Sequence, residues 1–131
     1  ESGIFYGRVR REKWSVEVEV SPLPRGKEIV EGRYAMVDGS TISVLTLSPE
    51  ELLREKVEAY LSRRKVRDLY DIYYLIGVIK EPARAAKDLK KLLTVLDEPP
   101  KDFASLKELI IAGISPSFET IRREVLRVAE G

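Results

Sequence analysis

Residues Leu47–Leu75, LSPEELLREKVEAYLSRRKVRDLYDIYYL, carry the clearest helical signal in the chain. Ser48 is a preferred N-cap residue, Pro49 suits the first helical position, and Glu51 completes a capping box. Glu50 and Glu51 also lie at the positive end of the helix dipole. We therefore predict that a helix begins after Ser48. The apolar residues that recur at helical spacing and form its predicted core face are Leu52, Leu53, Val57, Leu61, Leu69, Ile72, Leu75 and Ile76.

A second set of residues recurs every three or four positions: Lys56, Tyr60, Arg63, Arg67 and Asp71. A continuous helix would bring them onto one stripe. Such a stripe is commonly a solvated face, in which Arg67 and Asp71 form an i,i+4 ion pair worth about 0.3–0.5 kcal/mol. The run Arg63–Lys65 could also end the helix, because it contains no core-facing residue before Val66.

The residues before this stretch are patterned as strands. Residues 4–9 form one apolar run, and residues 14–21 alternate between apolar and polar side chains with period two. Asp38-Gly39 is a tight-turn pair between short strands at 34–37 and 41–45, and Gly39-Ser40 belongs to the same hairpin. After Leu75 the pattern is helical. We predict an α+β fold, a small antiparallel sheet over residues 1–47 followed by a C-terminal helical bundle over residues 48–131.

Two acidic residues share one face of the alternating strand. Glu17 and Glu19 are predicted to lie opposite the face formed by Trp14 and the valines. The simpler interpretation is the solvated face of an antiparallel strand. Two carboxylates on one face can also hold a hard cation such as Mg²⁺ through oxygen.

The composition excludes several kinds of chemistry. The 131 residues contain no Cys, His, Asn or Gln, so a disulfide framework, a thiol nucleophile, a zinc site and a His-based triad are ruled out within them. A formal net charge of +1 indicates that any phosphate site depends on a local cluster. No apolar run has the length of a membrane span, so we expect a cytoplasmic protein without membrane contact. The lack of amides together with 34% charged residues favours a thermophile source.

The helical stretch resembles two motifs of the AbiEii/AbiGii-type toxin nucleotidyltransferases. That family shows Ser-x-Glu-Glu, Glu-Lys, a small residue, an Arg, and Arg-Asp-Leu-x-Asp-Leu in the same order. The residues that match are Ser48, Glu50, Glu51, Glu55, Lys56, Ala59, Arg63, Arg67, Asp68, Leu69, Asp71 and Ile72. The resemblance is clearest over residues 16–75, and beyond them the chain is similar only as a helical tail.

The resemblance implies roles for particular residues. Lys56 and Asp68 would be catalytic, and Lys56, Arg63 and Arg67 would bind the phosphates of a nucleoside triphosphate (NTP). A strand of apolar-acid-apolar-Ser form carries a metal-binding carboxylate in the family. It matches Val18–Ser21, which makes Glu19 the first candidate and Glu17 the second. An antitoxin protein is implied as a partner.

The family's Gly-Ser and Asp-x-Asp motifs, which precede these residues, have no counterpart in this sequence. We therefore expect the C-terminal part of a metal-dependent nucleotidyltransferase, which transfers a nucleotide from an NTP to an RNA or protein acceptor. Mg²⁺ would bind only together with the missing upstream carboxylates, and this chain alone would be inactive. The alternative is a non-catalytic helical protein-interaction module. Lys56→Ala separates the two, because only the first predicts loss of transfer without loss of folding.

Overall fold

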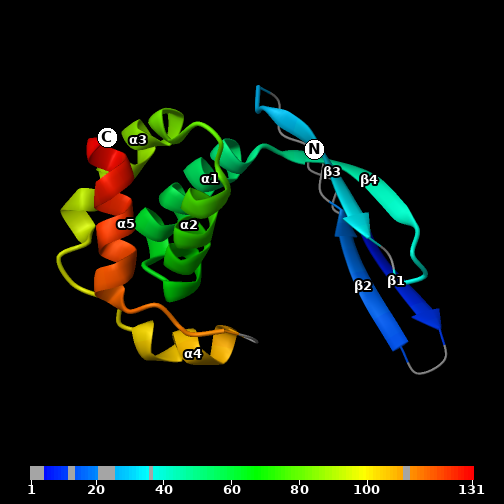
Figure 1. Ribbon diagram of the computed structural model, residues 1–131. Coiled ribbons are helices and arrows are strands. Elements are labelled where there is room, and N and C mark those ends of the chain that lie inside the picture. The colour runs from blue at the N-terminus through cyan, green and yellow to red at the C-terminus, as the bar shows by residue number, and fades with distance from the viewer. Residues whose placement is uncertain (1–4, 12–13, 21–25, 36, 111–112) are drawn as a thin grey trace. The chain divides into compact units, whose positions relative to one another are not determined.

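A computed structural model describes residues 5–11, 14–20, 26–35, 37–110 and 113–131 of the chain (Figure 1). The chain divides into two compact units, residues 1–46 and residues 47–131. The first unit is built from strands and the second from helices. We describe each unit by itself.

The strand unit consists of paired strands. Strand β1 (Phe5–Arg11) lies antiparallel to β2 (Trp14–Val20), with Tyr6 opposite Glu19 and Arg8 opposite Glu17. Strand β3 (Ile29–Ala35) pairs with β4 (Thr41–Leu47) in a second two-stranded sheet, so the predicted sheet is formed as two separate pairs in the described residues.

The turn between β3 and β4 uses the predicted turn residues. The backbone N–H and the hydroxyl of Ser40 donate to the Asp38 carboxylate at 2.9 and 2.6 Å, and Gly39 has a φ of 89°. Only glycine adopts that φ without strain. These two hydrogen bonds lower the pKa of Asp38. Gly39-Ser40 is thus hairpin chemistry, as predicted.

Helix α1 (Pro49–Arg63) begins where the sequence predicts. The Ser48 hydroxyl accepts a hydrogen bond from the backbone N–H of Glu51 at 3.2 Å, and Pro49 occupies the first turn. The helix ends at Arg63, because Arg64 adopts a left-handed conformation with φ 51° and ψ 44°. The backbone N–H of Arg64 then donates to the Tyr60 carbonyl at 2.9 Å. The run Arg63–Lys65 therefore does break the helix, as the lack of core-facing residues suggested.

The remaining helices build one core with α1. Helix α2 (Val66–Val78) follows at once, and α3 (Pro82–Lys90) continues into the 3₁₀ helix η1 (Lys91–Val95). The 3₁₀ helix η2 (Phe103–Ser105), the short α4 (Leu106–Leu109) and α5 (Phe118–Glu130) complete the unit. Helix α1 packs on α2 and α3, and α5 packs on α2 and α3 (Figure 1). The fully buried side chains at the centre include Leu53, Val57, Leu69, Ile72, Leu89, Ile121 and Val125.

The α+β class is confirmed, with antiparallel strands first and helices after them. The prediction of one continuous charged stripe from Lys56 to Asp71 is wrong, because the left-handed Arg64 separates α1 from α2. Tyr60, expected on that stripe, is 1% exposed and belongs to the core.

The carboxylate of Asp102 accepts a hydrogen bond from the backbone N–H of Val66, the first residue of α2, at 3.0 Å. The two residues lie 36 positions apart, so the contact depends on how the chain folds. Asp102 thus satisfies one of the free N–H groups at the start of a helix that precedes it in the chain.

Candidate functional site

A buried carboxylate joins the end of α1 to the start of α2. The side chain of Asp68 is only 1% exposed. Its oxygens accept hydrogen bonds from Nε and Nη2 of Arg63 at 2.7 and 2.8 Å. This forked geometry is the strong form of an arginine–carboxylate pair, and it raises the pKa of Arg63. The Arg63 side chain remains 59% exposed, so solvent reaches it despite the ion pair.

Lys56 joins the same pair of helices about two turns before Arg63 in α1. Its Nζ lies 2.7 Å from Asp71 Oδ2 and 4.0 Å from Asp68 Oδ1, and its side chain is 34% exposed. Two carboxylates therefore hold the ammonium group in place. We call Lys56, Arg63, Asp68 and Asp71 the α1–α2 ion cluster. It combines two partly exposed cations with one buried and one half-exposed carboxylate.

The ion cluster contains most, not all, of the helical residues that the sequence singled out. Lys56, Arg63 and Asp68 come together. Arg67 is exposed, and the described residues give it no ion pair. The expected pair of Arg67 with Asp71 is wrong, because Asp71 pairs with Lys56 across the two helices. Asp71 matches the family motif but was assigned no role in the site. Its contact with Lys56 can be predicted only when the break between α1 and α2 is known.

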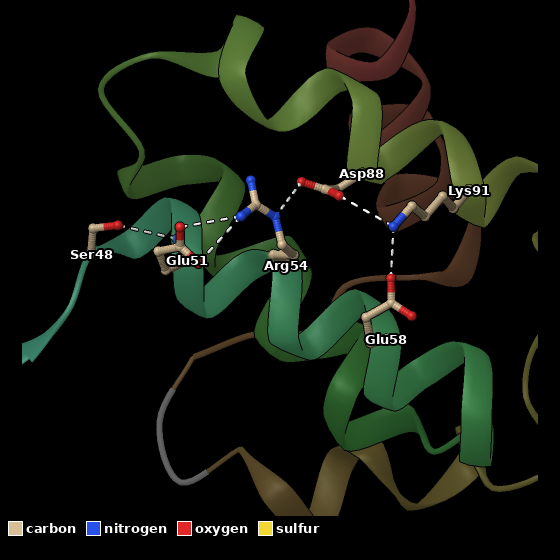
Figure 2. A network of polar contacts seen from close by, with 6 residues as sticks. All are labelled: Ser48, Glu51, Arg54, Glu58, Asp88 and Lys91. Carbon is tan, nitrogen blue, oxygen red and sulfur yellow. Dashed lines mark hydrogen bonds and ion pairs between the residues drawn. The ribbon is translucent and has the colours of Figure 1, made fainter. Parts of the chain in front are cut away.

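A second polar network joins α1 to α3 (Figure 2). The Arg54 guanidinium donates to Asp88 at 3.1 Å and to Glu51 at 3.2 Å. Lys91 completes the network, with its Nζ 2.7 Å from Glu58 and 3.4 Å from Asp88. Hydrogen bonding to Asp88 raises the pKa of Arg54, and hydrogen bonding to Glu58 raises that of Lys91. The contacts between residues three apart, Arg54 with Glu51 and Lys91 with Asp88, could have been predicted from helical spacing. The contacts between helices could not, because they depend on how the helices pack.

A pocket of about 470 Å³ lies at the end of α1. Its walls come from the last residues of α1, the link to α2 and the loop after η1. The lining residues are Tyr60, Arg63, Arg64, Lys65, Val95, Glu98, Pro99, Pro100, Lys101 and Asp102. The guanidinium of Arg64 lies 5.8 Å from the centre of the Tyr60 ring, in the range of a cation–π contact. Arg63 belongs to this pocket and to the α1–α2 ion cluster, so the two sites adjoin.

The predicted metal ligands lie in the strand unit. Positions 17 and 19 share one face of β2, because residues two apart in a strand do so. The side chains of Glu17 and Glu19 lie outside the described part of the structure. Among the residues that are described, no group of three or more acidic side chains could hold a metal ion. The role of Glu17 and Glu19 as metal ligands therefore stays a prediction.

None of the helices in the described ranges combines the length and the apolar character that crossing a bilayer requires.

The fold and the cluster define an α+β chain that places Lys, Arg and Asp side chains together where two helices meet. Residues 5–126 match the family described as "Nucleotidyl transferase AbiEii toxin, Type IV TA system". The chain belongs to this AbiEii nucleotidyltransferase toxin family. The predicted resemblance is thereby confirmed. No curated protein and no solved structure gives a match.

Proposed function

We propose that this chain supplies the phosphate-binding part of a metal-dependent nucleotidyltransferase that transfers a nucleotide from an NTP to an RNA or protein acceptor. In that reaction an acceptor oxygen bonds to the α-phosphorus, the bond to the bridging oxygen breaks, and pyrophosphate leaves. Negative charge gathers on the phosphate oxygens, so positioned cations stabilise the transition state. Lys56 and Arg63 are the cations that we assign to this role.

The observation that carries this proposal is the geometry of the α1–α2 ion cluster in a member of the AbiEii family. Lys56 is held by carboxylates at 2.7 and 4.0 Å yet keeps a third of its side chain exposed. A cation fixed in this way needs little reorganisation when a phosphate arrives. Asp68 acts as the orienting group, because it holds Arg63 through two hydrogen bonds and faces Lys56. Arg67 would add a contact from the exposed side of α2.

Metal binding forms the second half of the proposal. We assign Glu19, with Glu17 as the second choice, as carboxylate ligands of Mg²⁺. Bound Mg²⁺ would neutralise phosphate charge and orient the triphosphate. The 131 residues contain no Asp-x-Asp sequence. We therefore expect this chain to need further carboxylates for transfer and to be inactive by itself.

A second candidate function is a non-catalytic helical module for binding another protein. It is favoured by the fact that Lys56 and Arg63 both have carboxylate partners inside the chain. In that case the ion cluster only joins α1 to α2. The family description names a type IV toxin–antitoxin system, so an antitoxin is the partner we propose under either function. A cytoplasmic location and a thermophile source remain part of the proposal.

The test is Lys56→Ala in a full-length protein that carries this chain together with Gly-Ser and Asp-x-Asp motifs. Transfer of label from an NTP and thermal unfolding are measured on the same preparations. Loss of a phosphate-binding cation is expected to reduce transfer by a hundredfold or more, on the order of one lost transition-state donor. The melting temperature should stay near that of the matched control, Lys107→Ala on α4. Normal transfer with normal melting would refute the assignment of Lys56.

A further inference from the structure

We propose that the groove between α2 and α5 binds an arginine side chain presented by a partner protein. The groove has a volume of about 350 Å³ and is lined by Tyr73, Tyr74, Ile76, Gly77, Val78 and Glu124. The two helices that form it pack on each other in the helical unit (Figure 1). Its lining shares no residue with the α1–α2 ion cluster, so the inference goes beyond the proposed function.

The groove exposes large apolar side chains on the surface of α2. Tyr74 is 62% exposed, Val78 is 44% exposed, and the half-buried Tyr73 lines the same groove. Tyrosine is enriched where proteins bind one another, because its ring is apolar and its hydroxyl is polar. A small dissolved cation would leave Tyr74 and Val78 largely in water, whereas a protein surface would cover them. The occupant that we infer is therefore part of a protein.

The charge of the groove selects a basic side chain. Among the described residues that line it, Glu124 is the only charged one. The Nε and Nη2 groups of Arg127 both lie 3.0 Å from Glu124 Oε2. Because both contacts end on Oε2, the other oxygen of Glu124 can accept from a second donor. The Glu124 side chain is 31% exposed, so that donor can reach it from solvent.

Arginine suits this lining better than lysine does. Its planar guanidinium stacks on aromatic rings and is more weakly hydrated than an ammonium group. A cation over the face of a tyrosine ring is attracted by the negative charge of that face. The groove offers the rings of Tyr73 and Tyr74 together with a carboxylate oxygen. A guanidinium can use both at once, because its N–H donors point outward in the plane while its face stays free for a ring.

Gly77 keeps the space beside the two rings open. It lies in the last turn of α2, and alanine is more favourable than glycine in a helix. A Cβ atom added to Gly77 would meet no other element of the described structure within 4 Å, so helix packing does not require glycine here. Positions three and four residues apart share a helix face, so a side chain at position 77 would enter the space beside Tyr73 and Tyr74. Gly77→Leu should therefore fill the groove.

The experiment titrates this chain, ¹³C-labelled at tyrosine, with the peptide acetyl-Gly-Arg-Gly-amide and follows the ring signals of Tyr74 by NMR. The citrulline analogue of the peptide keeps its shape without the charge and should bind about fivefold more weakly. Gly77→Leu should weaken binding of the arginine peptide by about tenfold or more, because it overfills the groove. Glu124→Gln should weaken it about threefold. The matched control, Glu119→Gln on the same helix but outside the groove, should leave binding unchanged.

Three results would overturn the inference: no shift of the Tyr74 signals, equal binding of the arginine and citrulline peptides, or equal weakening by Glu124→Gln and Glu119→Gln. Sedimentation velocity tests another occupant. A chain that is dimeric, and that becomes monomeric with Gly77→Leu, would assign the groove to a second copy instead of a partner protein. If thermal unfolding shows that Gly77→Leu does not fold, the exposed Tyr74→Ala tests the same groove through isothermal titration calorimetry, with about fivefold weaker binding expected. Lys56→Ala should keep full peptide binding, so failure of the proposed transfer function would be seen separately.

Discussion

Replacement of Asp68 by alanine should destabilise the helical unit more than the loss of any exposed carboxylate. The side chain is 1% exposed and accepts two hydrogen bonds, at 2.7 and 2.8 Å, from a guanidinium. Hydrogen bonds to charged groups contribute about 1.5–3 kcal/mol each. Arg63 is 59% exposed and would regain water, which places the combined loss near the lower end. We expect a decrease of about 2–3 kcal/mol in the free energy of unfolding.

Urea unfolding followed by circular dichroism measures this decrease, and two further variants calibrate it. Asp71→Ala removes one ion pair in which both side chains are 34% exposed, so its effect should stay below about 1 kcal/mol. Asp97→Ala changes an exposed carboxylate after η1 and should lie within about 0.5 kcal/mol of the unaltered chain. If Asp68→Ala were as stable as Asp97→Ala, the reasoning about the buried carboxylate would be refuted.

Three other predictions concern the rest of the helical unit. Burial raises the pKa of the Tyr60 phenol above its ordinary 10.0, so the unfolded chain loses this proton first and stability falls as the pH rises past about 10. Tyr60→Phe should reduce that alkaline loss of stability, measured by urea unfolding at several pH values. An unchanged dependence of the free energy of unfolding on pH would contradict this. Arg64→Gly should stabilise the chain by about 0.5 kcal/mol, because relief of the left-handed strain outweighs the lost contact with the Tyr60 ring. A lower free energy of unfolding in urea would count against the strain. Asp88→Ala should lower the free energy of unfolding by about 1–2 kcal/mol, because it leaves Arg54 and Lys91 without their shared carboxylate. An effect no larger than that of Glu130→Ala would show that the network in Figure 2 adds nothing to stability.

Local signals in the sequence predicted local structure well. Ser48 and Pro49 start α1, and Asp38-Gly39 forms its turn, because capping and turn chemistry depend on neighbouring residues alone. The core face from Leu53 to Ile76 also followed from helical spacing. The end of α1 after Arg63 was one of two alternatives: the lack of core-facing residues in the run Arg63–Lys65 suggested it, beside a continuous helix.

The geometry of the site required information that is not local. Lys56 lies 15 residues from Asp71, and the two meet only because the left-handed Arg64 turns α2 back along α1. The same turn buries Tyr60 and leaves Arg67 on an exposed surface. The bond from Val66 to Asp102 spans 36 residues and needs the packed unit to exist. Motif order identified the residues of the ion cluster, whereas their pairing had to come from the fold.

The central claim is that the α1–α2 ion cluster binds the phosphates of an NTP. The most direct measurement is a titration of ¹⁵N-labelled chain with GTP, followed through the side-chain Nε–Hε signal of Arg63. That proton lies in the hydrogen bond to Asp68 Oδ2 at 2.7 Å, which should slow its exchange with water and keep its signal observable. We predict that the signal shifts as GTP is added and that Lys56→Ala greatly reduces the shift. A signal that does not move, or that moves equally in Lys56→Ala, would contradict the claim.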